Sequence, residues 1–218
     1  MIELIVKGAL GYLLGSVIGS LLIARLTGGV DIRKLGSGNA GATNALRTQG
    51  KAVALGVLAI DLAKGWIATA VLAPAVLPGT APGAADLRGW DTTVCALAVM
   101  LGHVYPLWYG FRGGKGMATL VGTVLGVHAG LLLPMVLTWF VMVTLFGFVG
   151  LASMTSAAAL ALSIGLGDLS PRAPLLSYGV LAALLIIFTH RSNIARMRAG
   201  NESRARRLWL LGARRGPG

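Results

Sequence analysis

The chain has 218 residues, of which 56% are hydrophobic and only 12% charged, and its formal net charge is +12. Soluble domains carry about 25% charged residues, so this composition excludes an ordinary soluble fold. It predicts an all-α integral membrane protein, because the apolar segments do not alternate with polar residues as barrel strands do. The positive-inside rule accounts for most of the excess charge, so no nucleic-acid partner is predicted. A single cysteine, Cys95, excludes a disulfide framework within one chain.

The first apolar segment, residues 2–26, contains small residues at regular spacing. Gly11, Gly15 and Gly19 recur every four positions. They therefore share one helix face, which is flat enough for a second helix to approach closely. The spacing predicts that this segment is a single span that packs through its glycines.

The second apolar segment, residues 52–77, carries two ionisable residues. Asp61 and Lys64 are three residues apart and share one face of a helix. Charged side chains are costly inside a membrane span and usually face the bundle interior. The spacing fits a structural ion pair and part of a polar site equally well.

A polar stretch, Gly36–Asn44, separates these two segments and has no side chain larger than asparagine. Its glycines permit a nest of backbone N–H groups that binds an anion. Cations and neutral donors add to it, namely Arg33, Lys34, Arg47 and Lys51 with Ser37, Asn39, Thr43 and Asn44. These features favour phosphate binding over a flexible linker. No Gly-Lys-Ser/Thr ending is present, which excludes a nucleotide P-loop.

A second glycine-rich basic turn follows the third apolar segment, residues 91–109. An exposed loop is expected before that segment, at residues 78–90. The turn contains Arg112 and Lys115 and opens directly onto an apolar helix at Met117. A helix N-terminus presents free N–H groups and a positive dipole, so this turn is also predicted to bind an anion.

The remaining apolar sequence, up to residue 189, is divided into four short spans. A third polar motif, His190–Glu202, and a basic tail, residues 203–218, follow it. Because basic loops stay in the cytoplasm, the three motifs are predicted on one membrane face. This arrangement gives seven transmembrane helices, with the N-terminus outside and the C-terminus cytoplasmic. Residues 1–202 are expected to form one domain, and the tail to be a non-catalytic surface segment.

The sequence lacks the residues that several enzyme chemistries require. It contains no Gly-X-Ser-X-Gly elbow, no His-X4-Asp pair and no acidic cluster for a phosphate-bound metal. No metal or cofactor is therefore predicted. His103 is expected to pack in an aromatic interfacial cluster and His128 at an outer helix end, whereas His190 begins a polar motif. Phosphate sites at the inner face of a membrane fit a phospholipid precursor.

These motifs together resemble the PlsY family, the bacterial acyl-phosphate:glycerol-3-phosphate acyltransferases. The matching residues are Gly36–Asn44 with Arg47, Asp61 with Lys64–Gly65, Gly102–His103 through Gly113–Thr119, and His190–Ile194 with Gly200 and Glu202. Ala40 stands where family members often have proline. The segment Leu151–Met154 resembles the small-residue turn before the sixth span, but it lacks the basic residue that precedes this turn in some members.

The resemblance implies an enzyme of the bacterial cytoplasmic membrane. Such an enzyme moves a fatty acyl group from acyl phosphate to the 1-hydroxyl of sn-glycerol 3-phosphate, which gives 1-acyl-glycerol 3-phosphate (lysophosphatidic acid) and phosphate. This is the first acylation step of phospholipid synthesis. An acyl phosphate is already activated, so no protein nucleophile is needed. The base is either His190 or the phosphate of the donor. A membrane transporter of phosphate or organophosphate is the alternative function.

The resemblance also implies two groups of site residues. The catalytic group is Ser37, Arg47, Lys115, His190, Asn193 and Glu202. The substrate-binding and phosphate-binding group is Gly36, Gly38, Asn39, Gly41, Thr43, Asn44, Gly113, Gly114, Gly116, Thr119 and Ser153.

Overall fold

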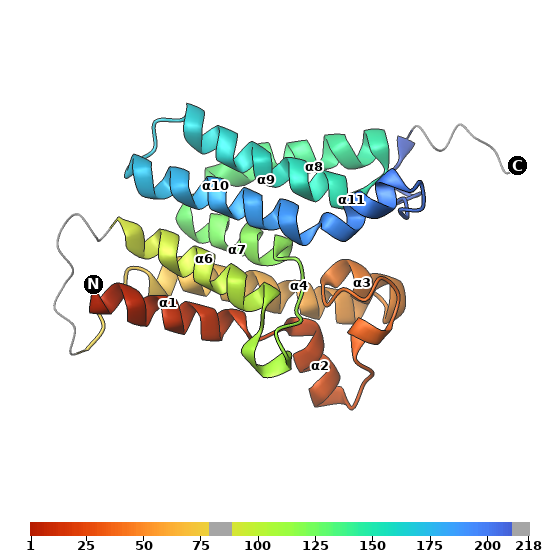
Figure 1. Ribbon diagram of the computed structural model, residues 1–218, viewed down its shortest axis with the longest axis horizontal. Coiled ribbons are helices and arrows are strands. Elements are labelled where there is room, and N and C mark those ends of the chain that lie inside the picture. Colours follow the sequence, from red (N-terminus) through yellow and green to blue (C-terminus); the bar gives the residue numbers. More distant parts are fainter. Residues whose placement is uncertain (79–88, 211–218) are drawn as a thin grey trace, which may run out of the picture. The chain divides into compact units, whose positions relative to one another are not determined.

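The computed structural model describes residues 1–78 and 89–210 (Figure 1). Most of the expected loop at residues 78–90 and the end of the basic tail therefore lie outside the described residues. Every regular element within them is helical. The chain divides into two compact units, Met1–Ala129 and Gly130–Gly218, and each is described by itself. The described part of the tail, residues 203–210, belongs to the second unit.

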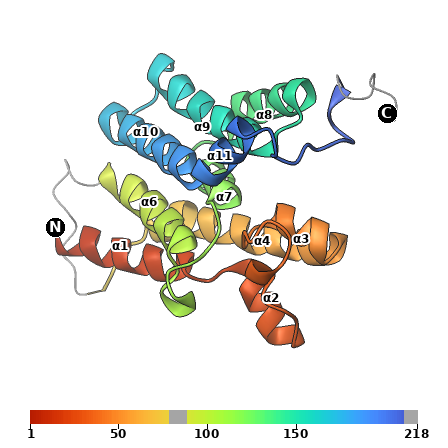
Figure 2. The same cartoon turned by 45° about the vertical axis from the view of Figure 1, so that its right-hand side comes forward.

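The first unit, unit 1, contains six α-helices and three shorter helical segments among its described residues. They are α1 (Ile2–Gly15), α2 (Gly19–Thr27), η1 (Ile32–Lys34), α3 (Ala42–Thr48), α4 (Lys51–Trp66), the π-helical η2 (Ile67–Leu72), α6 (Trp90–Val104), η3 (Leu107–Tyr109) and α7 (Met117–Val127). Helix α1 lies beside α6, and α4 packs against both α2 and α7 (Figure 2).

The second unit, unit 2, is built on a stack of long apolar helices. Helix α9 packs against both α8 and α10 (Figure 1). The Ser156 hydroxyl of α9 donates to the carbonyl of Met135 in α8 at 2.8 Å. The elements of this part of the chain are η4 (Ala129–Leu131), α8 (Leu132–Phe146), α9 (Val149–Leu166), α10 (Arg172–Thr189) and α11 (Arg191–Arg198).

The structure confirms a helical protein with several membrane-length apolar helices. Five described helices are long and apolar enough to cross a membrane, and a bent pair, α1 with α2, makes a sixth if it counts as one span. Helix α7 is apolar but shorter than these. The predicted number of seven spans and the orientation of the termini therefore stay predictions.

The segment predicted as the first span, residues 2–26, is not one continuous helix. Helices α1 and α2 meet at an angle of 50°. The sequence has no proline at this point. The break is instead stabilised from α4, because the ammonium of Lys64 donates to the carbonyls of Gly15 at 3.1 Å and Val17 at 2.7 Å. Partners of this kind are needed wherever backbone groups lose their helical bonds at membrane depth.

Glycines bring the helices of unit 1 into close contact, as their spacing predicts. A Cβ atom on Gly15 would overlap the backbone of Val99 in α6, and one on Gly102 would overlap the carbonyl of Tyr12 in α1. Helices α4 and α7 meet in the same way, at Gly65 and Gly122. Small residues at these crossings allow the packing that holds apolar helices together in a membrane.

Candidate active site

The first glycine-rich loop, residues 36–44, is held by one buried side chain. The amide nitrogen of Asn44 donates to the carbonyls of Ile32, Leu35 and Asn39 at 2.9–3.2 Å, and its oxygen accepts from the backbone N–H of Ser37 at 3.0 Å. Gly36 has a φ of +54°, and a Cβ atom on it would overlap the amide oxygen of Asn44. Asn44, predicted as a phosphate ligand, therefore uses its side chain to shape the loop.

Three other predicted ligands in this region face solvent. The side chains of Ser37, Thr43 and Arg47 are exposed, and they form no hydrogen bond with any residue that the structure describes. Asn39 is half-buried, and the carbonyl of Ala40 accepts a hydrogen bond from the hydroxyl of Ser20 at 2.8 Å. The loop thus has a fixed base and presents a serine and a threonine at its surface, and the exposed guanidinium of Arg47 follows in α3.

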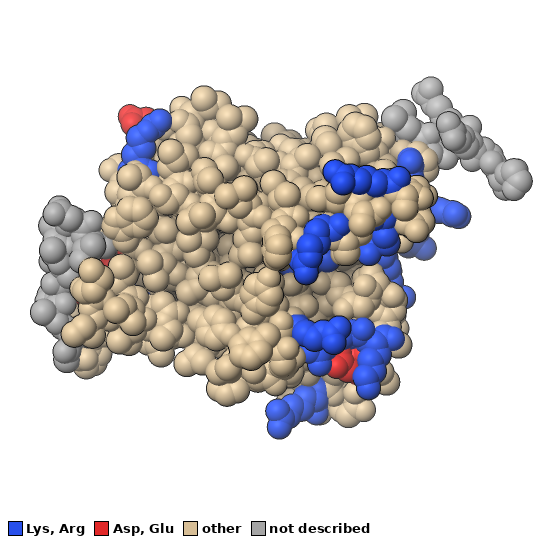
Figure 3. Space-filling model, viewed as in Figure 1, with Lys and Arg blue, Asp and Glu red and all other residues tan. Residues whose placement is uncertain are grey.

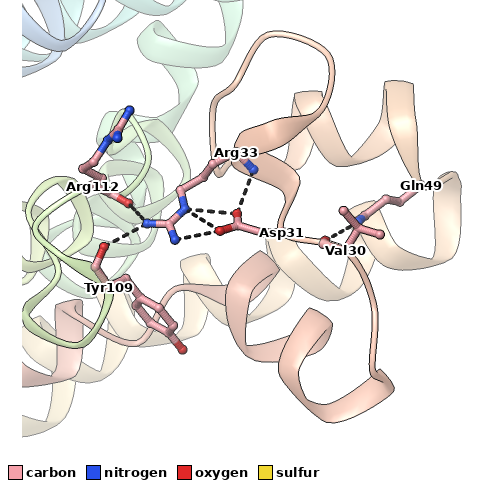
Figure 4. Close-up of polar contacts among 6 residues, drawn as sticks. All are labelled: Val30, Asp31, Arg33, Gln49, Tyr109 and Arg112. Carbon is pink, nitrogen blue, oxygen red and sulfur yellow. Dashed lines mark hydrogen bonds and ion pairs between the residues drawn. The ribbon is translucent and has the colours of Figure 1, made fainter.

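Arg33 lies in η1, directly before the first loop, and contacts the second loop, residues 110–116, and its start (Figure 4). Its Nη1 atom donates to the carbonyls of Tyr109 at 2.8 Å and Arg112 at 2.9 Å. Its Nε and Nη2 atoms bind the carboxylate of Asp31 at 2.7–3.0 Å. The sequence marks Arg33 only as a neighbouring cation. Its fork geometry, which suits two acceptors at once, was the available signal for this role.

The Asp31–Arg33 pair is held in its charged form. The hydrogen bond from Arg33 lowers the pKa of Asp31 below its ordinary value of 3.8, although partial burial acts in the opposite direction. The same bond to Asp31 raises the pKa of Arg33. Both groups are therefore ionised at neutral pH, and the contacts to the second loop come from a permanently charged guanidinium.

The second loop uses two of its backbone donors to close the end of α6. The N–H of Gly113 donates to the carbonyl of Val104 at 3.0 Å, and the N–H of Gly114 to that of His103 at 3.1 Å. These donors, predicted to face an anion, are therefore already bonded. Lys115 is half-buried, and Gly116, with a φ of +88°, precedes the first turn of α7. The side chain of Lys115 and the start of α7 are the other parts of this turn that the sequence predicts to bind an anion.

Thr119, a predicted ligand in the first turn of α7, is fully buried. Its hydroxyl has no hydrogen-bond partner among the described residues. Its carbonyl lies against Gly65 of α4, where no Cβ atom would fit. Thr119 thus lies at the crossing of α4 and α7 and leaves one buried hydroxyl unsatisfied.

A buried polar cluster lies behind the second loop. The ammonium of Lys64 is 2.9 Å from the carboxylate of Asp61 and 2.8 Å from Nδ1 of His103. All three side chains are at most 3% exposed. Of the two alternatives for Asp61 and Lys64, the structure favours a polar cluster that is larger than an ion pair. The expectation that His103 packs in an aromatic interfacial cluster is wrong, because its ring faces these two charges.

The third motif lies in unit 2, where Glu202 joins two residues of α11. Its carboxylate accepts from the amide of Asn193 at 2.6 Å and from Nε of Arg196 at 2.5 Å. Glu202 thus connects the end of the motif to α11. His190, at the junction of α10 and α11, has its Nδ1 2.8 Å from the carbonyl oxygen of Ile186. Because a carbonyl only accepts, Nδ1 carries a proton, and a neutral His190 has its acceptor at Nε2.

The start of α9 packs against this motif. A Cβ atom on Gly150 would overlap the side chain of Asn193 at 2.9 Å. Ser153 follows on the same helix, and its hydroxyl donates to the carbonyl of Val149 at 2.9 Å. The predicted ligand Ser153 is thus buried near this motif, with its proton used inside its own helix.

Basic side chains gather at particular ends of each unit. Figure 3 shows blue surface over the α2–α3 end of unit 1 and over the α11 end of unit 2, whereas the visible surface of α1 and α6 is tan. Within unit 1, the contacts of Arg33 show that the first two motifs share one end. Contacts within unit 2 show that Asn193 and the start of α9 lie at the same end of that unit.

Comparison with known proteins identifies the family. A family model described as glycerol-3-phosphate acyltransferase matches residues 5–200. The chain belongs to the glycerol-3-phosphate acyltransferase family. It is 40% identical over 200 residues to the glycerol-3-phosphate acyltransferase of Albidiferax ferrireducens, which covers 89% of this chain and 86% of the relative. It is 38% identical over 208 residues to the glycerol-3-phosphate acyltransferase of Cereibacter sphaeroides, and this match covers 94% of this chain and 90% of the relative.

Solved structures of the family have the same fold. The crystal structure of PlsY, an integral membrane glycerol 3-phosphate acyltransferase, in its glycerol 3-phosphate form has a TM-score of 0.79 and 34% identity. The match covers 92% of this chain and 94% of that one. The lysophosphatidic acid form also has a TM-score of 0.79, and the match covers 95% of this chain and 98% of that one. Together with the apolar helices, this similarity shows that the chain is a multi-pass membrane protein.

Proposed function

We propose that this chain transfers a fatty acyl group from acyl phosphate to the 1-hydroxyl of sn-glycerol 3-phosphate. The products are 1-acyl-glycerol 3-phosphate (lysophosphatidic acid) and inorganic phosphate. The observation that carries the proposal is the junction of the two glycine-rich loops by Arg33, which places exposed neutral and cationic donors at one end of unit 1. Solved relatives described as glycerol 3-phosphate and lysophosphatidic acid forms correspond to an acceptor and a product of this reaction.

Phosphate binding falls to Arg47 and Lys115 in this proposal. Arg47 is exposed beside the first loop, and Lys115 precedes the start of α7. A charge-assisted hydrogen bond contributes about 1.5–3 kcal/mol to binding. Two such cations account for a reaction in which both substrates carry phosphate. Ser37 and Thr43 supply neutral donors to the same ligands.

The acceptor is positioned by the third motif. His190 and Asn193 hold glycerol 3-phosphate, and Glu202 fixes Asn193 through the 2.6 Å hydrogen bond described above. We place the three motifs on the cytoplasmic face of the bacterial inner membrane, on the positive-inside argument. Labelling of Lys34→Cys and Asn201→Cys variants from the same side of the membrane is the expected result, and labelling from opposite sides would disprove this topology.

The chemistry is a direct attack. The oxygen of the 1-hydroxyl bonds to the acyl carbon, the bond from that carbon to the phosphate oxygen breaks, and the hydroxyl proton leaves to a base. Cys95 is buried, and Ser37 has no base within hydrogen-bond distance among the described residues, so no acyl-enzyme is proposed. The base is the departing phosphate or Nε2 of His190, and neither route needs a metal or cofactor.

Purified protein, incubated in detergent with labelled glycerol 3-phosphate, tests the proposal. Acyl phosphate should support formation of lysophosphatidic acid, and acyl-CoA should not. Formation of product from acyl-CoA alone would overturn the assignment of the donor. If instead proteoliposomes take up glycerol 3-phosphate without acylating it, the chain is a transporter and the enzymatic proposal fails.

Variants identify the binding groups. Arg47→Ala and Lys115→Ala should each lower kcat/KM by about tenfold or more, as the loss of one charge-assisted phosphate contact predicts. Arg25→Ala is the matched control, because Arg25 is also an exposed cation of unit 1 but lies in the last turn of α2. Unchanged kinetics for both substrates in the two site variants would disprove these roles.

Labelled acyl phosphate alone distinguishes direct attack from a ping-pong route. Without glycerol 3-phosphate, the enzyme should release no stoichiometric burst of phosphate and should retain no acid-stable acyl label. A burst with an acyl group trapped on Ser37 would show that an acyl-enzyme forms.

A further inference from the structure

The break between α1 and α2 leaves backbone groups that α4 satisfies. In a continuous helix, the N–H of Gly19 would bond to the carbonyl of Gly15. Here that N–H lies 3.3 Å from the carboxylate of Asp61, and the ammonium of Lys64 takes the Gly15 carbonyl at 3.1 Å. Asp61 and Lys64 therefore supply both halves of the missing bond. Ionised groups are costly inside a membrane, and those that occur there usually face the bundle interior, as these two do.

His103 connects this pair to the second loop. An ammonium has no acceptor atom, so the 2.8 Å contact between Lys64 and Nδ1 of His103 makes Nδ1 the acceptor. The imidazole then carries its proton on Nε2. That edge of the ring faces Gly114, where an added Cβ atom would overlap Nε2. The main-chain carbonyl of His103 also accepts the N–H of Gly114 at 3.1 Å.

The ring and the main-chain carbonyl of His103 thus contact Gly114 from two sides. Lys115 directly follows Gly114 in the chain. Lys64 contacts Nδ1 of the His103 ring at 2.8 Å, and the same atom lies 3.5 Å from the carboxylate of Asp61. A side chain at residue 114 would not fit over the ring. Contacts inside the helix bundle therefore reach the residue that precedes Lys115.

We propose that Asp61, Lys64 and His103 are positioning residues that hold Lys115 in place for phosphate binding. They contact neither substrate and act through the backbone of Gly114. This inference rests on the proposed function, since it assumes that Lys115 binds a phosphate group. It assigns a role to Asp61 and Lys64 of α4. The sequence alone did not distinguish a structural role for this pair from a functional one.

A double-mutant cycle with full-length protein in detergent tests the inference. His103→Leu removes the acceptor for Lys64 and should lower kcat/KM by about tenfold or more, because a misplacement of about 1 Å can cost a hundredfold in rate. Combined with Lys115→Ala, it should lower kcat/KM by less than about twofold further, since both changes then remove the same contact. His128→Leu, a change at an exposed histidine at the end of α7, should have no effect.

Conservative variants separate positioning from loss of fold. His103→Asn can still accept from Lys64 through its amide oxygen but leaves no ring edge against Gly114, so it should lose activity at an unchanged melting temperature. His103→Gln carries its amide one bond farther out, toward Gly114, and should retain more activity than His103→Asn. If His103→Leu does not fold, the comparison of the Asn and Gln variants decides the question.

The outcomes have distinct meanings. If His103→Leu lowers the activity of Lys115→Ala by the same factor as that of the wild type, the cluster does not act through Lys115 and the inference fails. Equal activity of the Asn and Gln variants also overturns it. If the wild type and His128→Leu transfer no acyl group to glycerol 3-phosphate, the proposed function itself fails.

Discussion

The two glycine-rich loops of unit 1 have similar compositions but are built differently. The first loop is organised by a side chain, because the amide of Asn44 bonds to three carbonyls and one N–H around it. The second loop is organised by main-chain carbonyls at the end of α6, with the ring of His103 below it. A run of glycines therefore does not by itself show which N–H groups are available to an anion.

The difference assigns binding to different groups in each loop. In the first loop and in α3, which follows it, the exposed groups are side chains, among them Ser37 and Arg47. In the second loop the N–H groups of Gly113 and Gly114 are already bonded, so the proposed binding is assigned to Lys115 and the first turn of α7. The first loop should thus be sensitive to loss of its organising side chain, and the second to added volume.

Substitution of Asn44 should have the largest effect. Asn44→Ala leaves several buried backbone groups unpaired, each at a cost of about 1–3 kcal/mol. We expect a fall in the melting temperature and a loss of activity of a hundredfold or more. Asn44→Asp keeps only the acceptor for Ser37 and should be nearly as damaging. Normal melting and activity in both variants would show that the amide does not organise the loop.

Added volume at Gly114 should have the next largest effect. The new Cβ atom of Gly114→Ala meets His103, so kcat/KM should fall by about tenfold. Gly110→Asn is the control, since Gly110 has a φ of +66° but no atom within 4 Å of the position that a Cβ atom would occupy, and asparagine tolerates this conformation. Comparable losses in the two variants would contradict a specific contact with His103.

The link between the loops should have an intermediate effect. Arg33→Lys keeps the charge but loses the fork that reaches Asp31 and two carbonyls at once. We expect an increase of about fivefold in the KM of at least one substrate, with a smaller change in kcat. Arg33→Ala should be worse than Arg33→Lys, and steady-state kinetics with each substrate varied in turn will measure both.

The same link predicts a dependence on pH. Because the pKa of Asp31 in the folded protein lies below its ordinary value of 3.8, the ionised carboxylate stabilises the fold above that value. This contribution should be constant at neutral pH and should be lost as the pH falls through the lowered pKa. The melting temperature of Asp31→Asn should therefore be lower than that of the wild type at pH 7, with a difference that shrinks in acid. A difference that grows in acid would contradict this sign.

Truncation of the tail should have the smallest effect on activity. The tail is docked in unit 2, where the guanidinium of Arg204 lies 3.9 Å from the Trp209 ring and the N–H of Ala205 donates to the carbonyl of Gly147 at 2.8 Å. Truncation after Ser203 should keep turnover in detergent but lower the melting temperature by roughly 2–4 °C, the shift that about 1 kcal/mol produces in a chain of this size. A stable but inactive truncated protein would show that the tail contributes to catalysis.

Local sequence determined which class of protein this is and where its polar motifs lie. Long apolar segments with few charges have no stable alternative to helices in a membrane, since their backbone groups must bond internally. Glycines at every fourth position likewise predicted that another helix approaches closely, although only the structure shows that Gly15 meets α6 and Gly19 meets α4. The family resemblance followed from motif spacing along the chain and did not require knowledge of contacts.

Tertiary structure decided how those motifs are supported. Arg33 bonds to carbonyls 76 and 79 residues away, and Lys64 contacts His103 across 39 residues. The break at Gly15 depends on the same long-range contacts, and nothing in the apolar pattern of residues 2–26 marks it. Periodicity determines which face of a helix a residue occupies, but the crossing of two helices determines which residue it meets. For this reason, the buried support behind Lys115 could be found only in the folded chain.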